Sequence, residues 1–181
     1  YRDALSLELL SARLQTERTN DEDTSFTLGT LASELQTQGK YDEAEPLCRE
    51  ALEVSRESLG DRHLGTLGSM NNLGWLLIDK GDLAAAEPLL REALEVRRET
   101  LGDRHPHTLA SMNNIGLLLT AKGDLAAAEP LLREALEGRR ETLGDRHSST
   151  LRIMRDLGRL LKAKGGDLAA AESETLLREA N

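Results

Sequence analysis

Three histidines recur with acidic and basic neighbours, and clusters of this kind are where catalytic chemistry would first be sought. They close the Gly-Asp-Arg-His tetrads that begin at Gly60, Gly102 and Gly144, at a constant spacing of 42 residues. A feature that returns in every copy of a repeat belongs to its scaffold, so we interpret each tetrad as turn and helix-capping chemistry. His105 and His107 alone make a poor metal site, because a structural zinc ion takes four ligands. We therefore predict no metal site.

Signatures of other enzyme chemistry are missing from the sequence. It contains no glycine-rich phosphate loop, no nucleophile elbow and no HExxH motif. The single cysteine, Cys48, aligns with Leu90 and Leu132 of later copies, which indicates a buried apolar position rather than a catalytic thiol. The sequence thus predicts a protein that is not an enzyme and has no cofactor.

The charge and hydropathy of the chain exclude two classes of partner. Its formal net charge is −9, whereas a general nucleic-acid binder needs a basic surface. No apolar run approaches the roughly 20 residues of a membrane span, and no signal peptide is visible. We predict a cytoplasmic protein that does not bind nucleic acid or insert into a membrane. Because the chain opens at Tyr1 in what reads as mid-helix, we also expect it to be part of a longer array.

The elements that position these residues repeat as helix pairs. The segment Gly81–His105 returns as Gly123–His147 with a single change, from Val96 to Gly138. A fixed period in this range is typical of stacked two-helix repeats, in which each repeat contacts only its neighbours.

Within one repeat, leucines at helical spacing predict a first helix over 66–80 and a second over 83–101. Gly81 is expected to end the first helix in the left-handed conformation, and Asp82 to cap the second. Small residues such as Gly116 and Ala128 should let the two helices approach closely as an antiparallel pair.

The predicted organisation is a single all-α array over residues 1–181. In chain order, we expect the second helix of a preceding repeat in 1–20, repeat 1 in 21–62, repeat 2 in 63–104, repeat 3 in 105–146 and an irregular repeat 4 in 147–181. In repeat 4 Gly166 is extra, and Ser173–Thr175 stands where the other copies have a single proline. The last helix is therefore either re-registered or frayed.

The sequence resembles the tetratricopeptide repeat family, in the 42-residue form found in kinesin light chains and nephrocystin-like proteins. The residues that carry the resemblance are Met70–Gly74, Met112–Gly116, the glycines Gly81 and Gly123, and the linker Leu101–Pro106. The resemblance implies a right-handed α-solenoid of antiparallel helix hairpins. It also implies that the first helices line a concave groove, which commonly holds a peptide from a partner protein.

By the same resemblance, one face of each first helix lines this groove. The implied residues are Phe26, Gly29, Ser33 and Gln36 in repeat 1, Gly68, Asn71, Trp75 and Ile78 in repeat 2, Ala110, Asn113, Leu117 and Thr120 in repeat 3, and Arg152, Arg155, Arg159 and Lys162 in repeat 4. Asn71 and Asn113 would bracket a peptide backbone, because an amide both donates and accepts hydrogen bonds. Alternatively, they solvate the groove or bond between neighbouring helices. Trp75 would anchor a partner or pack between adjacent first helices.

The basic residues of repeat 4 depart most clearly from the other copies. Arg152, Arg155, Arg159 and Lys162 follow one another at intervals of 3, 4 and 3 residues, which places them on one helix face. Arginine binds carboxylates and phosphates bidentately, so this basic stripe favours an acidic segment of the partner. A solvated end face or a contact to a following repeat would explain it equally well.

The function predicted from the sequence is a non-catalytic scaffold that binds a partner peptide or protein in the groove. Two alternatives stay open. One is a structural subunit packed through its outer surface or its ends in a larger assembly. The other is a regulatory region of a longer multidomain protein.

Overall fold

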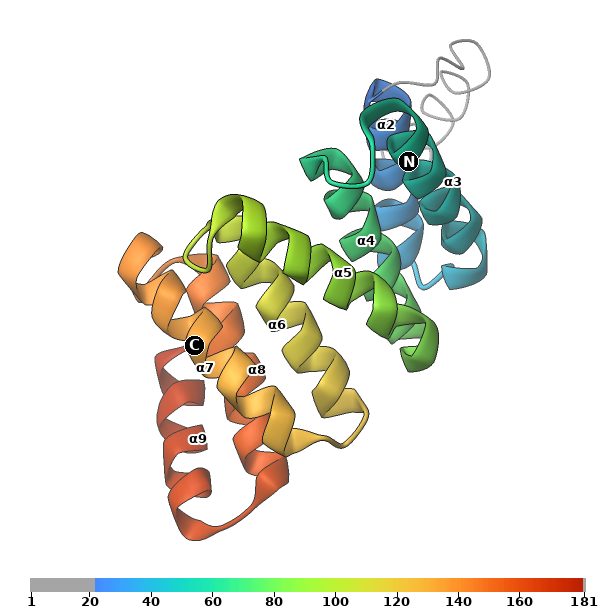
Figure 1. The fold of residues 1–181 in the computed structure, drawn as a ribbon. Coiled ribbons are helices and arrows are strands. Elements are labelled where there is room, and N and C mark those ends of the chain that lie inside the picture. Colours follow the sequence, from blue (N-terminus) through green and yellow to red (C-terminus); the bar gives the residue numbers. More distant parts are fainter. Residues whose placement is uncertain (1–21, 181) are drawn as a thin grey trace. The chain divides into compact units, whose positions relative to one another are not determined.

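The computed structural model describes residues 22–180, and every element in that range is an α-helix, so the all-α class is confirmed for these residues. In chain order the helices are α2 (Glu22–Thr37), α3 (Tyr41–Leu59), α4 (Leu64–Lys80), α5 (Leu83–Leu101), α6 (Pro106–Ala121), α7 (Leu125–Leu143), α8 (Ser148–Lys164) and α9 (Asp167–Glu179) (Figure 1). The helix expected in residues 1–20 lies outside the described residues.

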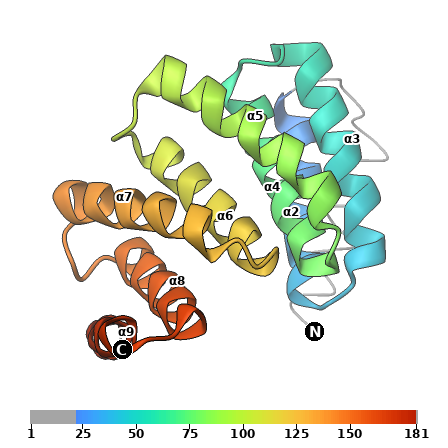
Figure 2. The same ribbon diagram turned by 60° about the horizontal axis from the view of Figure 1, so that its bottom comes forward.

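The chain divides into two compact units, an N-terminal unit up to Leu89 and a C-terminal unit from Leu90, and α5 runs across the division. In the N-terminal unit α3 packs against both α2 and α4, and α2 also contacts α4. In the C-terminal unit α7 packs against both α6 and α8, while α9 lies beside α8 (Figure 2). The plan is the same in both units, because the second helix of a pair contacts two first helices.

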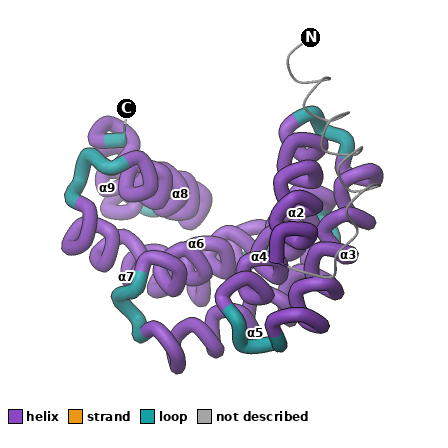
Figure 3. The backbone as a smooth tube through the Cα atoms, turned by 90° about the horizontal axis from the view of Figure 1, so that it is seen from above, coloured by secondary structure: helices purple, strands orange, loops and turns teal. Residues whose placement is uncertain are grey.

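Short turns join successive helices, and Figure 3 shows them as teal segments between purple helices. Gly81 ends α4 with φ 83° and ψ 3°, in the left-handed region where a side chain would add strain. Asp82 and Asp124 then cap α5 and α7, each accepting a hydrogen bond at 3.1 Å from the backbone N–H three residues on. The predicted glycine stop and aspartate cap are both confirmed.

Leucine, alanine and methionine form the core, since aromatic residues make up only 2% of the chain. Leu67, Met70 and Leu73 of α4 are buried, and Leu109 and Met112 occupy the same positions of α6. Intervals of three residues keep these side chains on one helix face. Burying one such side chain stabilises the fold by roughly 1.5–3 kcal/mol relative to leaving it exposed.

Glycines on the first helices let a leucine of the second helix come close. A Cβ built at Gly116 would lie 2.6 Å from the side chain of Leu132. The sequence predicts that Ala128 faces Gly116, and Ala128 is buried. The side chain closest to Gly116, however, belongs to Leu132, one helical turn beyond Ala128.

Repeat 4 keeps this contact despite its irregular sequence. A Cβ built at Gly158 would lie 2.9 Å from Leu177, which follows three residues later than the regular spacing would place it. Ser173, from the segment that replaces the proline, is buried and donates a hydrogen bond to the Gly158 carbonyl at 2.7 Å. The last helix is therefore packed with a shifted register and is not frayed.

Candidate functional site

The tetrad histidines cap the helices that follow them. Nδ1 of His63, His105 and His147 accepts a hydrogen bond from the backbone N–H two residues on, at 3.1, 3.2 and 3.2 Å respectively. The tetrad aspartates pair with an arginine near the end of the preceding helix, in Arg56–Asp61 at 3.2 Å, Arg98–Asp103 at 3.0 Å and Arg140–Asp145 at 2.8 Å. Each ring satisfies an N–H group that a helix start leaves open. The predicted turn and capping role is confirmed.

Cys48 lies in the core of α3, with 4% of its surface exposed. Burial raises the pKa of its thiol to about 11, and the nearby Glu45 carboxylate contributes to the rise. Because the thiolate is the reactive form, this thiol is inert near neutral pH.

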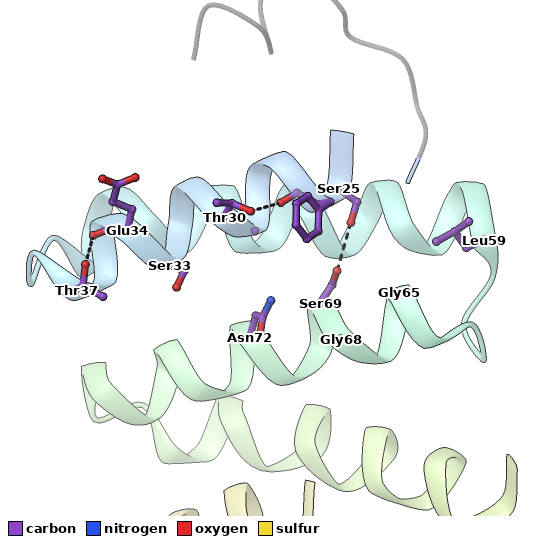
Figure 4. Close-up of a pocket in the computed structure, with 12 residues that line it drawn as sticks. Ser25, Thr30, Ser33, Glu34, Thr37, Leu59, Gly65, Gly68, Ser69 and Asn72 are labelled. Carbon is purple, nitrogen blue, oxygen red and sulfur yellow. Dashed lines mark hydrogen bonds between the residues drawn. The ribbon is translucent and has the colours of Figure 1, made fainter. Parts of the chain in front are cut away.

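A cavity of about 570 Å³ opens between α2 and α4 in the N-terminal unit (Figure 4). It is lined by Ser25, Phe26, Gly29, Thr30, Ser33, Glu34, Thr37, Leu59, Gly65, Gly68, Ser69 and Asn72. Four groove residues implied by the family resemblance are among them, namely Phe26, Gly29, Ser33 and Gly68. We call this hollow the α2–α4 cavity.

The α2–α4 cavity combines open backbone with small polar groups. A Cβ built at Gly68 would meet no atom within 4 Å, and one at Gly29 would meet only the Asn72 amide, at 3.6 Å. Figure 4 shows Ser33 and Asn72 pointing into the space between the two helices. Phe26 is 75% exposed. A partner's main chain could therefore approach closely, next to hydrogen-bonding groups and an aromatic ring.

Asn71 and Asn113, predicted to form an amide ladder in the groove, are only 7% and 1% exposed. The Asn71 amide donates to the Leu67 carbonyl of its own helix at 2.8 Å. The Asn113 amide donates to Asp156 on the neighbouring first helix at 3.4 Å. Asn113 thus bonds between helices, which was the alternative interpretation. The amide that lines the α2–α4 cavity is Asn72, one position further along, which the sequence pattern does not single out.

Trp75 is half-buried on α4. It follows Gly68 by seven residues, or about two helical turns, so both residues lie on the same side of the helix. Trp75 does not line the α2–α4 cavity. Its role as an anchor stays a prediction.

The basic stripe of α8 is exposed at all four of its positions, Arg152, Arg155, Arg159 and Lys162. Beneath it lies the buried carboxyl of Asp156, whose Oδ1 is 3.9 Å from Nη1 of Arg159. Burial raises the pKa of Asp156, while the Asn113 hydrogen bond and the three arginines oppose that rise. The structure therefore brings the four cations together on one solvent-facing surface, and ligand binding there stays a prediction.

Two buried arginines were not selected from the sequence. Arg97 on α5 and Arg139 on α7 are 5% and 9% exposed. Both align with Ser55 of repeat 1, and this change from serine to arginine was the signal available.

A family model described as tetratricopeptide repeat matches residues 23–99, 76–141 and 108–174. Among solved structures, the chain is similar to BtubC (BKLC) from P. vanneervenii, with 24% identity, a TM-score of 0.76, and coverage of 98% of this chain and 69% of that one. It is also similar to a putative kinesin light chain from Podosopora anserina with nearly identical TPR-like repeats, with 24% identity, a TM-score of 0.72, and coverage of 98% and 83%. No curated protein matches the chain.

These similarities to solved structures show the fold. A third similar structure belongs to a protein of lower sequence identity. A double mutant of MamA RS-1 is 17% identical, with a TM-score of 0.66 and coverage of 98% of this chain and 84% of that one. Among the described helices, none is both long and apolar enough to cross a membrane.

Proposed function

The chain belongs to the tetratricopeptide repeat family, and we propose that it binds an extended segment of a partner protein along the exposed faces of its first helices. The repeats form a protein-interaction scaffold fold. The array itself carries out no catalysis under this proposal, and its contribution is to hold the partner.

The observation that carries the proposal is the α2–α4 cavity. The bare Cα atoms of Gly29 and Gly68 leave room for a peptide backbone, while Ser33 and Asn72 offer it donors and acceptors. Phe26 adds apolar contact area, the kind of contact that dominates binding energy at interfaces.

Each unit favours a partner segment of its own charge character. Among the residues that line the α2–α4 cavity, Glu34 is the charged one, so a neutral stretch fits there. The basic stripe of α8 fits an acidic stretch, through Arg152, Arg155, Arg159 and Lys162. Trp75 is the proposed aromatic anchor, whereas the buried Asn71 and Asn113 act on the ligand only by holding the helices in place.

Filling the cavity tests this proposal directly. Peptides would be selected on the protein from a random phage-displayed library, and their affinities measured by fluorescence anisotropy. Gly68→Leu should weaken binding at least about tenfold, because one buried hot-spot contact is commonly worth more than about 1.4 kcal/mol. The unfolding temperature should not fall, since a Cβ at Gly68 meets open space and leucine favours a helix more than glycine does.

Ala84→Leu supplies the matched control, because it adds the same side chain at an exposed position of α5 outside the cavity. It should bind as the wild type does. Equal affinity for Gly68→Leu and Ala84→Leu would contradict groove binding and favour a contact through the outer surface.

Charge reversal on α8 tests the acidic part of the proposal. The double change Arg155→Glu and Arg159→Glu should weaken binding of a glutamate-rich peptide about tenfold and spare a neutral one. Exposed ion pairs contribute only about 0.2–1 kcal/mol each, so the loss should shrink as salt is raised. Unchanged affinity for the acidic peptide would remove the stripe from the binding surface.

A further inference from the structure

One position of the second helices changes chemistry between the units. In the N-terminal unit it is Ser55, which shares hydrogen bonds with Ser25 and Ser69 and is fully buried. In the C-terminal unit it is Arg97 and then Arg139, each spaced by 42 residues from the preceding copy. A neutral, satisfied group is thus replaced by two buried charges.

The hydrogen-bond partners of the two arginines are neutral. Nη1 of Arg97 donates to the Ser111 hydroxyl at 2.7 Å and to the His107 carbonyl at 3.3 Å. Nη2 of Arg139 donates to the Pro106 carbonyl at 2.7 Å. Both guanidinium groups therefore reach the beginning of α6 from different helices.

Each guanidinium also has an unused donor. Nε of Arg97 and Nε of Arg139 are buried without a hydrogen-bond partner, and neither arginine forms an ion pair within the described part of the chain. A buried donor without an acceptor costs free energy, and a buried charge without a counter-charge costs more. Such groups call for an explanation, and affinity for an anion supplies one.

Other basic side chains lie near the same place. Burial lowers the pKa of Arg97 to about 10. Burial and then Arg152 lower the pKa of Arg139, while burial, Arg97, His105 and Arg139 lower that of His107. The nearby carboxyl, Asp156, interacts electrostatically with Arg152 and accepts a hydrogen bond from Asn113. Positive charge is therefore concentrated here in a chain whose net charge is −9.

We propose that Arg97, His107, Arg139 and Arg152 form a binding site for a phosphate group beside the first turn of α6. His107 and Arg152 are exposed and form its entrance, and Arg97 and Arg139 lie behind them. A phosphate group carries close to two negative charges and several acceptor oxygens, which suits a site with several cationic donors on different helices. The site differs from the α8 stripe because its inner residues come from the second helices, and it does not depend on peptide binding by the N-terminal unit.

The test is a titration of the full chain with inorganic phosphate at constant ionic strength, balanced with sodium chloride. Phosphate should raise the unfolding temperature saturably, and calorimetry should give a matching dissociation constant. Arg97→Met and Arg139→Met should each weaken phosphate binding at least about tenfold, because they remove a charged hydrogen-bond donor. Without phosphate, Arg97→Met should unfold at no lower temperature than the wild type, since it removes a charge that lacks a partner.

Arg146→Ser is the matched control. It removes one positive charge from an exposed loop of the same unit, outside the cluster, and should bind phosphate as the wild type does. Should Arg97→Met fail to fold, His107→Ser probes the site from its exposed side with the residue that repeat 4 carries as Ser149. That variant too should weaken phosphate binding.

O-phosphoserine identifies the source of the phosphate group. Tighter binding than inorganic phosphate would assign the site to a phosphorylated side chain of a partner, and weaker or equal binding to the free ion. The proposal is overturned if phosphate stabilises the chain no more than chloride does. It is equally overturned if Arg146→Ser loses as much affinity as Arg97→Met.

Discussion

At one repeat position the N-terminal unit has a neutral side chain and the C-terminal unit has charged ones. In the N-terminal unit Ser55 closes a network of three buried hydroxyls with Ser25 and Ser69. In the C-terminal unit the equivalent residues are Arg97 and Arg139, which are charged and whose buried Nε donors have no hydrogen-bond partner. A repeat can therefore preserve its backbone plan while one position changes from scaffold to candidate ligand site.

The difference extends to the first helices next to these positions. Gly65 and Gly68 line the α2–α4 cavity without adding charge on the α4 side, whereas the aligned residues in the C-terminal unit include His107 and Arg152. The N-terminal unit is thus suited to a neutral peptide and the C-terminal unit to an anionic group.

Moving the charge into the N-terminal unit should give the largest effect on stability. Ser55→Arg would bury a guanidinium in the serine network, where Gly65 replaces His107. We expect the free energy of unfolding to fall by about 3–5 kcal/mol, the usual cost of a buried charge left without a partner. Urea denaturation followed by circular dichroism measures this. A loss below about 1 kcal/mol, or rescue by phosphate, would mean that the two environments are equivalent after all.

A second contrast concerns the residue just before that position, which is Val54 in repeat 1, Val96 in repeat 2 and Gly138 in repeat 3, so this change falls within the C-terminal unit. A Cβ built at Gly138 would lie 2.5 Å from Leu109 and 3.3 Å from Nη1 of Arg104. Gly138→Val should therefore cost about 1–3 kcal/mol through overpacking.

The reciprocal change, Val54→Gly, serves as the comparison for Gly138→Val. It should also destabilise, but through a cavity beside the buried Val54 and a more flexible unfolded chain. If Gly138→Val proved stabilising in thermal unfolding, the space at Gly138 would not be occupied as described.

The smallest effect on stability is expected at a glutamate–lysine pair that both units contain. Glu45 accepts a hydrogen bond from Lys80 at 2.7 Å, and Glu129 accepts one from Lys164 at 2.6 Å. These hydrogen bonds, together with one from a neighbouring arginine in each case, lower the pKa of both carboxyls. Glu129→Gln should cost about 0.5 kcal/mol, as partly exposed pairs do, and Glu45→Gln should act in the same direction.

The pH dependence of these two variants follows from the lowered pKa values. The stabilisation of the fold by each glutamate carboxylate is fully present above its unfolded-state pKa of about 4.5. It is lost as the pH falls through the lower folded-state pKa. Unfolding temperatures of variant and wild type should therefore converge only in strong acid. A difference that instead grows as the pH falls below 4.5 would contradict the assignment.

The sequence was sufficient to predict the helix pairs, because the glycine stops, the caps and the leucine spacing all repeat. The predicted first helix over 66–80 compares with α4 at Leu64–Lys80. The sequence alone does not predict which of two neighbouring side chains on a helix is buried. Asn71 and Asn72 differ by about 100° around the helix, and only the packing of the folded chain decides which of them is buried.

The buried arginines could not have been predicted from residue type. Arginine on a second helix is normally solvent-exposed, because its long stem lets the charged group reach water. The carbonyls of Pro106 and His107 and the Ser111 hydroxyl accept hydrogen bonds from Arg97 and Arg139, and these contacts need the folded arrangement of three helices.

Equivalent places in the two units are proposed to bind different chemistry, and an NMR titration tests this central claim within one molecule. Inorganic phosphate would be added to the isotope-labelled chain at constant ionic strength while backbone amide shifts are followed. We expect saturable shifts around His107–Ser111 and no comparable shifts around the aligned Gly65–Ser69. Shifts of equal size in both segments, or none in either, would contradict the claim.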